Sequence, residues 1–122
     1  MINRVQYWKN ISRDDLKNNP DKIFLFGDNL IHKGLGGQAK VMRGEKNAIG
    51  IPTKKYPSMH DTSFFSDDEF HLNRFHIDRA FDSIPKGVVV VIPLSGLGTG
   101  LAELPFRAPM TYNYLLDKIK EL

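Results

Sequence analysis

Residues 26–40 read FGDNLIHKGLGGQAK, a stretch that leaves an apolar strand, crosses a polar turn with three glycines and enters a helix. The four residues that end at Phe26 are all apolar, as expected of a buried strand. Gly34, Gly36 and Gly37 lose more conformational freedom on folding than other residues would. A chain that accepts this loss at one turn favours a ligand lying against the backbone there.

The composition predicts one soluble domain over residues 1–122. Hydrophobic residues make up 41% and charged residues 25%, as in ordinary globular proteins. We find no apolar run near the ~20 residues of a membrane span, and the N-terminal residues lack the apolar core of a signal peptide. The chain has no cysteine, which excludes disulfides and thiol chemistry. We therefore expect a cytoplasmic protein without a membrane partner.

The formal net charge of +3 slightly favours a phosphate-bearing ligand or a nucleic acid. The basic residues are scattered, however, and a solvated surface explains them as well. A small nucleic-acid-binding protein is thus one hypothesis, although the clustered Lys/Arg stripe that such a protein uses is missing.

Hydrophobic periodicity and turn residues predict alternating strands and helices. The alternation predicts an α/β fold with a parallel or mixed sheet and helices on both faces. In the clearest helix, residues 66–87, Ser66 and Glu69 have the spacing of a capping box. The expected elements are helix 12–20, strand 22–27, helix 37–44, strand 47–53, helix 66–87, strand 88–93 and helix 109–122.

Two glycine-rich loops follow the two most apolar strands: the first glycine loop (residues 27–37) and the second glycine loop (residues 94–104). Ligands of such sheets bind outside the carboxyl ends of the strands, so we expect both loops at one cleft. Gly96, Gly98 and Gly100 alternate with small or apolar residues, and successive amides of such a turn can surround an oxyanion. The spacing is neither the dinucleotide fingerprint nor a P-loop, and a plain tight turn is the alternative.

Asp28 and Asn29 stand where the first strand ends. An Asp there can accept a hydrogen bond from a ligand, and an Asn can both donate and accept. The alternative for either residue is an Asx-turn that only shapes the loop.

Three segments resemble macrodomains, the α/β domains that bind ADP-ribose. They are GDNLIHKGLGGQAKVMRG (27–44), IGIPTKKYPS (49–58) and IPLSGLGTGLAELPF (92–106). The similarity is nearest to the branch of terminal ADP-ribose glycohydrolases and of antitoxins that remove ADP-ribose from DNA. It implies a three-layer α/β/α fold with a mixed sheet, and ADP-ribose or an ADP-ribosylated macromolecule, such as a nucleic acid, as the partner.

The resemblance also implies roles for individual residues. Asn29 would contact the distal ribose, the second glycine loop would enclose the diphosphate, and Glu103 would be the catalytic acidic residue. The branch's catalytic Lys aligns nearest to Met42, with Lys40 and Arg43 beside it. The implied ligand-binding set is Gly27, Asp28, Asn29, Gly34, Gly36, Gly37, Thr53, Lys54, Ser95, Gly96, Leu97, Gly98, Thr99 and Gly100.

Cleavage of a glycosidic bond needs a positioned nucleophile and a proton or charge for the leaving group. Glu103 could activate a water, and Lys40, Lys54 or His32 could supply the proton. The structural alternatives are a helix first turn for Glu103 and a solvated surface for Lys54.

Aromatic side chains near residues 56–65 could stack on a base, and Tyr56, Phe64 and Phe65 are the candidates. Packing in the core explains Phe64 and Phe65 equally well. The four histidines do not form a compact ligand set, so we predict neither a metal nor a cofactor.

The function predicted from the sequence is binding of ADP-ribose with hydrolysis of its link to a macromolecule, catalysed by Glu103, Lys40 and Asn29. The alternative is a module that binds ADP-ribose or a nucleotide without cleaving it. The Met at the lysine position favours the alternative, and Glu103 favours the enzyme.

Overall fold

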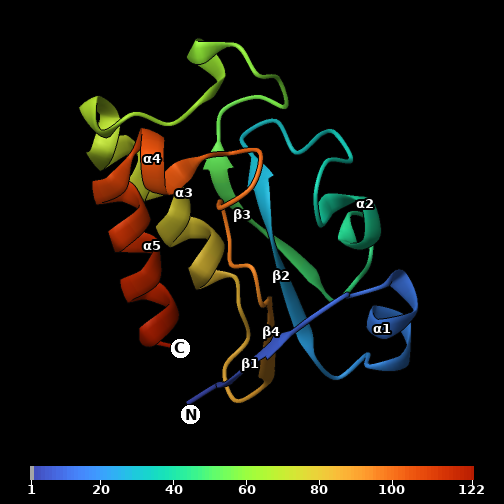
Figure 1. Cartoon of the computed structure of the whole chain (residues 1–122). Coiled ribbons are helices and arrows are strands. Elements are labelled where there is room, and N and C mark those ends of the chain that lie inside the picture. The colour runs from blue at the N-terminus through green and yellow to red at the C-terminus, as the bar shows by residue number, and fades with distance from the viewer. Residues whose placement is uncertain (1) are drawn as a thin grey trace.

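A computed structural model describes residues 2–122, which form an α/β fold with a four-stranded parallel sheet and five helices (Figure 1). Strands and helices alternate along the chain, as predicted. The strands are β1 (Arg4–Trp8), β2 (Ile23–Asn29), β3 (Ala48–Lys54) and β4 (Val89–Pro93). The helices are α1 (Arg13–Asn18), α2 (Ala39–Met42), α3 (Phe70–Asp82), α4 (Leu104–Arg107) and α5 (Pro109–Lys120).

The sheet has the strand order β1-β4-β2-β3, and all its strand pairings are parallel. The expectation of a mixed sheet was therefore wrong for these strands. The physical reason is that a helix lies in each connection from β1 to β4, and such a crossover returns the chain to the edge where the previous strand began. Strand β1 was not predicted, because it is a half-exposed edge strand without a continuous apolar run.

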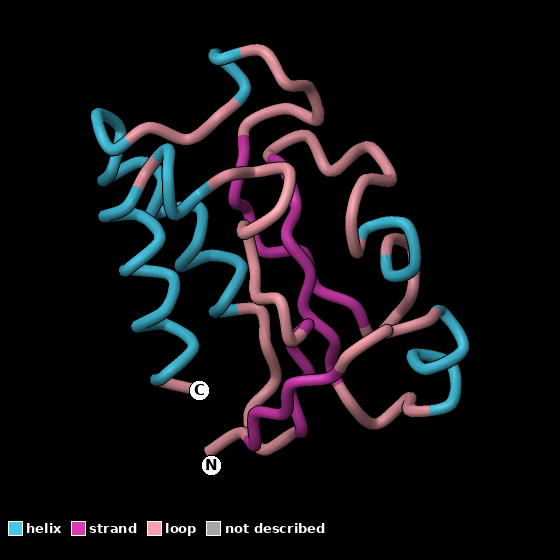
Figure 2. The backbone as a smooth tube through the Cα atoms, viewed as in Figure 1, coloured by secondary structure: helices cyan, strands magenta, loops and turns pink. Residues whose placement is uncertain are grey.

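The apolar residues of β2 and β4 alternate between the two faces of the sheet. Phe24, Phe26 and Val91 belong to a cluster with Leu16 of α1 and Met42 of α2. The residues next to them in the same strands belong to a second cluster, which also contains residues of α3 and α5. Figure 2 shows the helices lying on either side of the central strands. This second cluster includes Leu25, Val90, Ile92, Ile77, Phe81 and Leu115.

Helix ends follow the predicted signals in part. Ser12 and Asp15 form a capping box at α1. Ser66 instead caps a short 3-10 turn, η2 (Asp67–Glu69), by accepting a hydrogen bond from the Asp68 amide. The predicted capping box at residue 66 was wrong, because the Glu69 side chain pairs with Lys55 at 2.5 Å.

Helix α5 makes polar contacts with η2, which precedes α3, and with α3 itself. The Asp67 carboxylate accepts hydrogen bonds from the Met110 and Thr111 amides at the start of α5. Further along, the Tyr114 hydroxyl of α5 donates to the Asp78 carboxylate of α3. These contacts hold α5 in place beside the second glycine loop, which precedes it. Within residues 2–122, no helix has the length and apolarity needed to cross a membrane.

We predict that the free energy of unfolding falls less steeply at alkaline pH in Tyr114→Phe than in the wild type. The hydrogen bond to Asp78, together with burial, raises the pKa of Tyr114 from 10.0 to about 12. Because the folded pKa is the higher one, this contribution to stability is complete below pH 10 and is lost between pH 10 and 12. Urea unfolding of both proteins across this range is the measurement.

The difference in unfolding free energy between wild type and Tyr114→Phe should shrink as the pH rises through that window. A difference that stays constant from pH 8 to pH 12 would contradict the prediction. Comparing the two proteins cancels the titration of the lysines, which they share.

Candidate functional site: a cleft at the carboxyl end of the sheet

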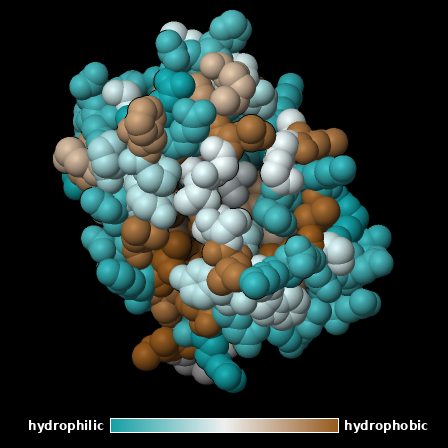
Figure 3. Space-filling view, viewed as in Figure 1, coloured by the Kyte–Doolittle hydropathy of each residue, from teal (hydrophilic) through white to brown (hydrophobic). Residues whose placement is uncertain are grey.

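A cleft of about 360 Å³ opens between the two glycine loops, at the carboxyl ends of β2 and β4. In Figure 1 both loops lie at the same end of the sheet. The predicted convergence is therefore confirmed. Its physical cause is that β2 and β4 are parallel neighbours, so the loops that follow them leave from one edge. Figure 3, drawn from the same side as Figure 1, shows a pale surface of near-neutral hydropathy in the middle of the visible face.

The two loops touch each other across the cleft. A Cβ on Gly36 would lie 2.8 Å from Leu101 Cδ1, so the Leu101 side chain reaches the first glycine loop only because residue 36 is glycine. Gly98 has a φ of +75°, and a Cβ there would lie 3.0 Å from side-chain atoms of both Thr53 and Leu104. Side chains at these positions would separate the loops from each other and from β3.

Both loops present backbone N–H groups without partners. In the described part of the chain, residues 2–122, nothing accepts a hydrogen bond from the amides of residues 97–102 or 34–38. In the second glycine loop, Gly96 and Gly98 have positive φ angles, the backbone pattern that turns successive amides toward one side. The lining of the cleft is thus rich in hydrogen-bond donors.

The charged side chains that line the cleft carry a positive excess. Lys33, Arg43 and Lys54 are cationic, and Asp28 is the one anionic residue in the described lining. Free donors and positive charge together suit a ligand with several acceptor oxygens and negative charge.

Asp28 is buried and is held by other residues of the protein. Its Oδ1 accepts hydrogen bonds from Arg43 Nη2 at 2.6 Å and from the Asn29 amide at 2.8 Å. Its Oδ2 lies 3.2 Å from Arg43 Nη1 and 3.0 Å from His32 Nδ1. Burial alone would raise the pKa of Asp28, but the hydrogen bonds from Arg43, His32 and Asn29 outweigh it and hold the pKa below 3.8.

Asn29 shapes the first glycine loop. Its Oδ1 accepts hydrogen bonds from the amides of Ile31 and Lys33, and its Nδ2 donates to the Lys33 carbonyl at 2.7 Å. This is the Asx-turn geometry that the sequence left open. Asn29 lines the cleft as well, and so does the buried Thr53, whose hydroxyl donates to the Asp28 carbonyl.

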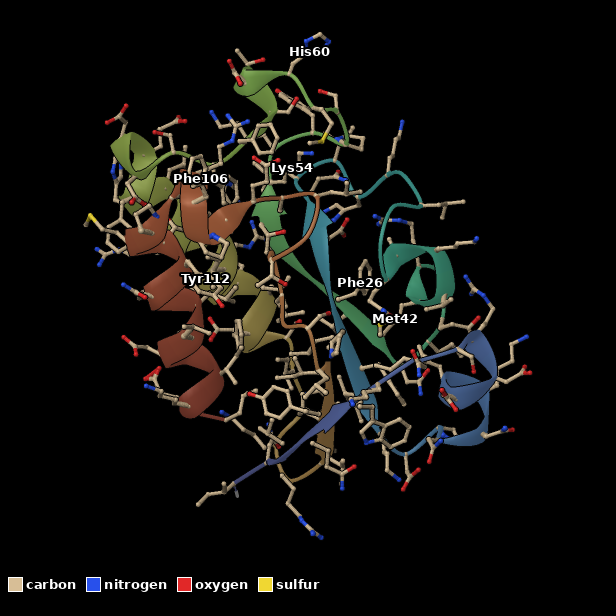
Figure 4. The ribbon with its side chains drawn as sticks, in the orientation of Figure 1. Phe26, Met42, Lys54, His60, Phe106 and Tyr112 are labelled. Atoms are coloured by element: carbon tan, nitrogen blue, oxygen red, sulfur yellow. The ribbon has the colours of Figure 1, made fainter. Side chains whose placement is uncertain are left out.

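Lys54 is the buried cation of the site. Its side chain lies at the carboxyl end of β3 (Figure 4), and the residue is only 7% exposed. Its ammonium donates to the Met59 sulfur and to the Leu101 carbonyl, both at 3.3 Å, and neither acceptor carries a charge. Burial lowers the pKa of Lys54, Glu103 opposes this effect, and Arg107 adds to it. A buried lysine with a lowered pKa in a cleft is typical of functional sites.

Glu103 directly precedes α4 as its N-cap residue and has a φ of +48°, an uncommon conformation for a residue with a side chain. Its carboxylate accepts a hydrogen bond from Arg107 Nε at 3.1 Å and lies outside the lining of the cleft. Arg107 also pairs with Asp61. The hydrogen bonds to Asp61 and Glu103 raise the pKa of Arg107 above its ordinary value.

Three predicted site residues lie outside the lining of the cleft: Glu103, Leu97 and Lys40. Leu97 lies between Gly96 and Gly98, is only 2% exposed, and packs its side chain in the hydrophobic core. Lys40 is exposed on α2, outside the lining. Met42, the position that aligns with the branch's lysine, is fully buried between α2 and β2 beside Phe26 (Figure 4).

All the other residues of the predicted ligand-binding set line the cleft. They are Gly27, Asp28, Asn29, Gly34, Gly36, Gly37, Thr53, Lys54, Ser95, Gly96, Gly98, Thr99 and Gly100.

Sequence reasoning missed several lining residues. Leu35, Met59 and Leu101 form an apolar rim from three separate loops, and each is more than half exposed. Arg43 and Lys33 were missed as lining residues because nothing in their spacing shows that Arg43 contacts Asp28 or that Lys33 lies at the cleft. A single Lys or Arg in a loop is usually solvated, and its partner becomes visible only in three dimensions.

The candidate aromatic residues do not face the cleft. Phe64 and Phe65 are buried, and Phe64 packs beneath Lys54 and Arg107, whose charged groups lie 4.5 Å and 3.8 Å from the ring centre. Tyr56 is exposed outside the lining. Among residues 2–122, no three His, Asp or Glu side chains lie close enough together to hold a metal ion.

The chain belongs to a family of unknown function (DUF7831), whose model matches residues 6–118. Comparison with curated proteins and with solved structures finds no match. The match to the family covers β2 to β4 and both glycine loops, and so covers the whole cleft.

We predict that Gly50→Ala destabilises the protein by about 2 kcal/mol, the cost of forcing an extra methyl into a packed site. A Cβ on Gly50 would lie 2.5 Å from Asp28 Oδ2, and the Arg43 and His32 contacts leave that carboxylate no room to move. Urea unfolding is the measurement.

Gly100→Ala is the matched control, because a Cβ there meets no atom within 4 Å. Its unfolding free energy should stay within about 0.5 kcal/mol of wild type. Equal losses in the two variants would show that the packing of Gly50 against Asp28 is not a tight constraint.

Proposed function

We propose that the protein binds ADP-ribose in this cleft through its diphosphate. The observation that carries the proposal is the set of unpartnered backbone amides in the two loops that line one cleft, next to a buried lysine. Amide nests of this kind favour oxyanions, and a nearby ammonium adds charge-assisted hydrogen bonds. The apolar rim of Leu35, Met59 and Leu101 supplies surface for the uncharged rings of the ligand.

The resemblance to macrodomains supports the same ligand. The segments that carry it are the two glycine loops and the PTK element of residues 52–54, and all three contribute to the lining. We further propose that the helices on the two faces of the sheet form the three-layer arrangement of that family. The parallel sheet with two glycine loops at its carboxyl edge agrees with this relationship.

Removal of ADP-ribose from a macromolecule is the second candidate function, and Lys54 is the observation that favours it. A general acid must release its proton readily, and the pKa of Lys54 is lowered by burial. In the proposed step, the bond from the anomeric carbon to the leaving group breaks, and the leaving group takes a proton from Lys54. Water bonds to that carbon and gives its proton to Glu103, whose side chain must first turn away from Arg107.

Calorimetric titration tests the binding proposal, with ADP-ribose, AMP and a generic oligonucleotide as ligands. We expect ADP-ribose to bind more tightly than AMP, and the oligonucleotide to bind weakly. Lys54→Met should weaken ADP-ribose binding by about tenfold or more, because a charge-assisted hydrogen bond is lost. Lys40→Met is the matched control, since Lys40 is exposed outside the lining.

Gly98→Val, with circular dichroism to verify its fold, should abolish binding because it pushes the second glycine loop away from Thr53. Equal affinity for AMP and ADP-ribose would refute the diphosphate site. Preferred binding of the oligonucleotide would favour the nucleic-acid-binding alternative.

Turnover of an ADP-ribosylated oligonucleotide and of an ADP-ribosylated protein tests the second function. Glu103→Gln and Lys54→Met should each reduce the rate by about 10²-fold, the usual contribution of a general acid or base. Binding of ADP-ribose should persist in Glu103→Gln, since its side chain lies outside the lining. Tight binding without any turnover would identify a binding module.

A further inference from the structure

Gln38 has a polar atom that nothing in the protein satisfies. Its Oε1 is buried and, among the side chains of residues 2–122, is the one buried polar atom without a hydrogen-bond partner. The residue stands between the first glycine loop and α2, and it lines the cleft. A buried acceptor without a donor destabilises the protein that holds it. It therefore points to a donor that the ligand-free protein lacks.

The other carboxylate and amide oxygens of the lining are already engaged. Both Asp28 oxygens accept hydrogen bonds from Arg43, and the Asn29 amide and His32 occupy their remaining positions. Asn29 Oδ1 accepts from two amides of its own loop. Of these three side chains, only Gln38 has an oxygen left for a ligand.

The surroundings of Gln38 indicate which ligand group donates to it. The unpartnered amides of residues 34–38 and the cationic Lys33 attract a phosphate to this side of the cleft. In a nucleotide the unit bonded directly to a phosphate is the ribose, and its hydroxyl groups are hydrogen-bond donors. A ribose hydroxyl would then lie beside Gln38 while the phosphate contacts the backbone of the same loop.

We propose that Gln38 Oε1 accepts a hydrogen bond from a ribose hydroxyl of the bound nucleotide, so that Gln38 selects ribose over deoxyribose. The inference rests on the proposed function, because it assumes a nucleotide diphosphate in the cleft. Since no protein donor holds Oε1, the side-chain amide turns toward the ligand without breaking a hydrogen bond. The hydroxyl also relieves the unsatisfied acceptor, which is why its removal from the ligand is costly.

A cycle of protein and ligand changes tests this inference by calorimetry. The ligands are ADP-ribose and two analogues, one lacking the 2-hydroxyl of the adenosine ribose and one lacking that of the terminal ribose. Wild type should bind one analogue about tenfold more weakly than ADP-ribose. Gln38→Leu should bind ADP-ribose and that analogue equally, since the acceptor is gone. The analogue that shows the effect identifies the ribose.

Two further variants separate this role from a structural one. Gln38→Glu keeps an acceptor oxygen and should still discriminate between ADP-ribose and the sensitive analogue. Lys40→Ala, on the exposed side of α2, should discriminate as wild type does. Without ligand, Gln38→Leu should unfold at a temperature no lower than wild type, because it removes an unsatisfied polar atom.

The outcomes are distinct. ADP-ribose binding with equal affinity for both analogues overturns the role of Gln38 and leaves the diphosphate site intact. If one analogue binds more weakly than ADP-ribose and the difference in affinity is just as large in Gln38→Leu, the role of Gln38 is also overturned, because another residue then contacts the hydroxyl. Absence of ADP-ribose binding to wild type overturns the proposed function and this inference with it.

Discussion

The site depends on one constraint, the parallel pairing of β2 with β4 in the middle of the sheet. Phe24 of β2 is paired with Val91 of β4, so the two most apolar strands run side by side in the same direction. Both strands are covered on both faces, which makes a change of register costly. Each strand then delivers its glycine loop to the same edge, and the cleft exists because the loops meet there.

The ion pair between Asp28 and Arg43 is the main electrostatic contact within this arrangement. It joins the end of β2 to the residue that follows α2 and so fixes the first glycine loop, which lies between them. Because Arg43, His32 and a backbone amide occupy the carboxylate, the one acid in the described lining does not oppose an anionic ligand. Lys33 and Lys54 remain to act on the ligand, and the buried Lys54 is the less hydrated of the two.

Sequence reasoning succeeded where local patterns determine the outcome. The apolar runs of β2 and β4, the Ser12 cap and the glycine positions are all set by neighbouring residues, and the structure confirms them. It failed for β1, because an edge strand has little pattern of its own, and for Glu69, because Lys55 competes for its side chain. Leu97 was grouped with the loop residues, although the turn directs its side chain into the core.

By itself the sequence determined the alternation of strands and helices and the two flexible turns at apolar strand ends, since both follow from hydrophobic spacing and from the conformational freedom of glycine. Only the tertiary structure decided which side chains are free to meet a ligand. Arg43 is bound to Asp28, Met42 is in the core, Lys54 is buried at the cleft and Gln38 keeps an unpaired oxygen. These differences arise from contacts between residues far apart in the chain, and such contacts leave no local pattern in a single sequence.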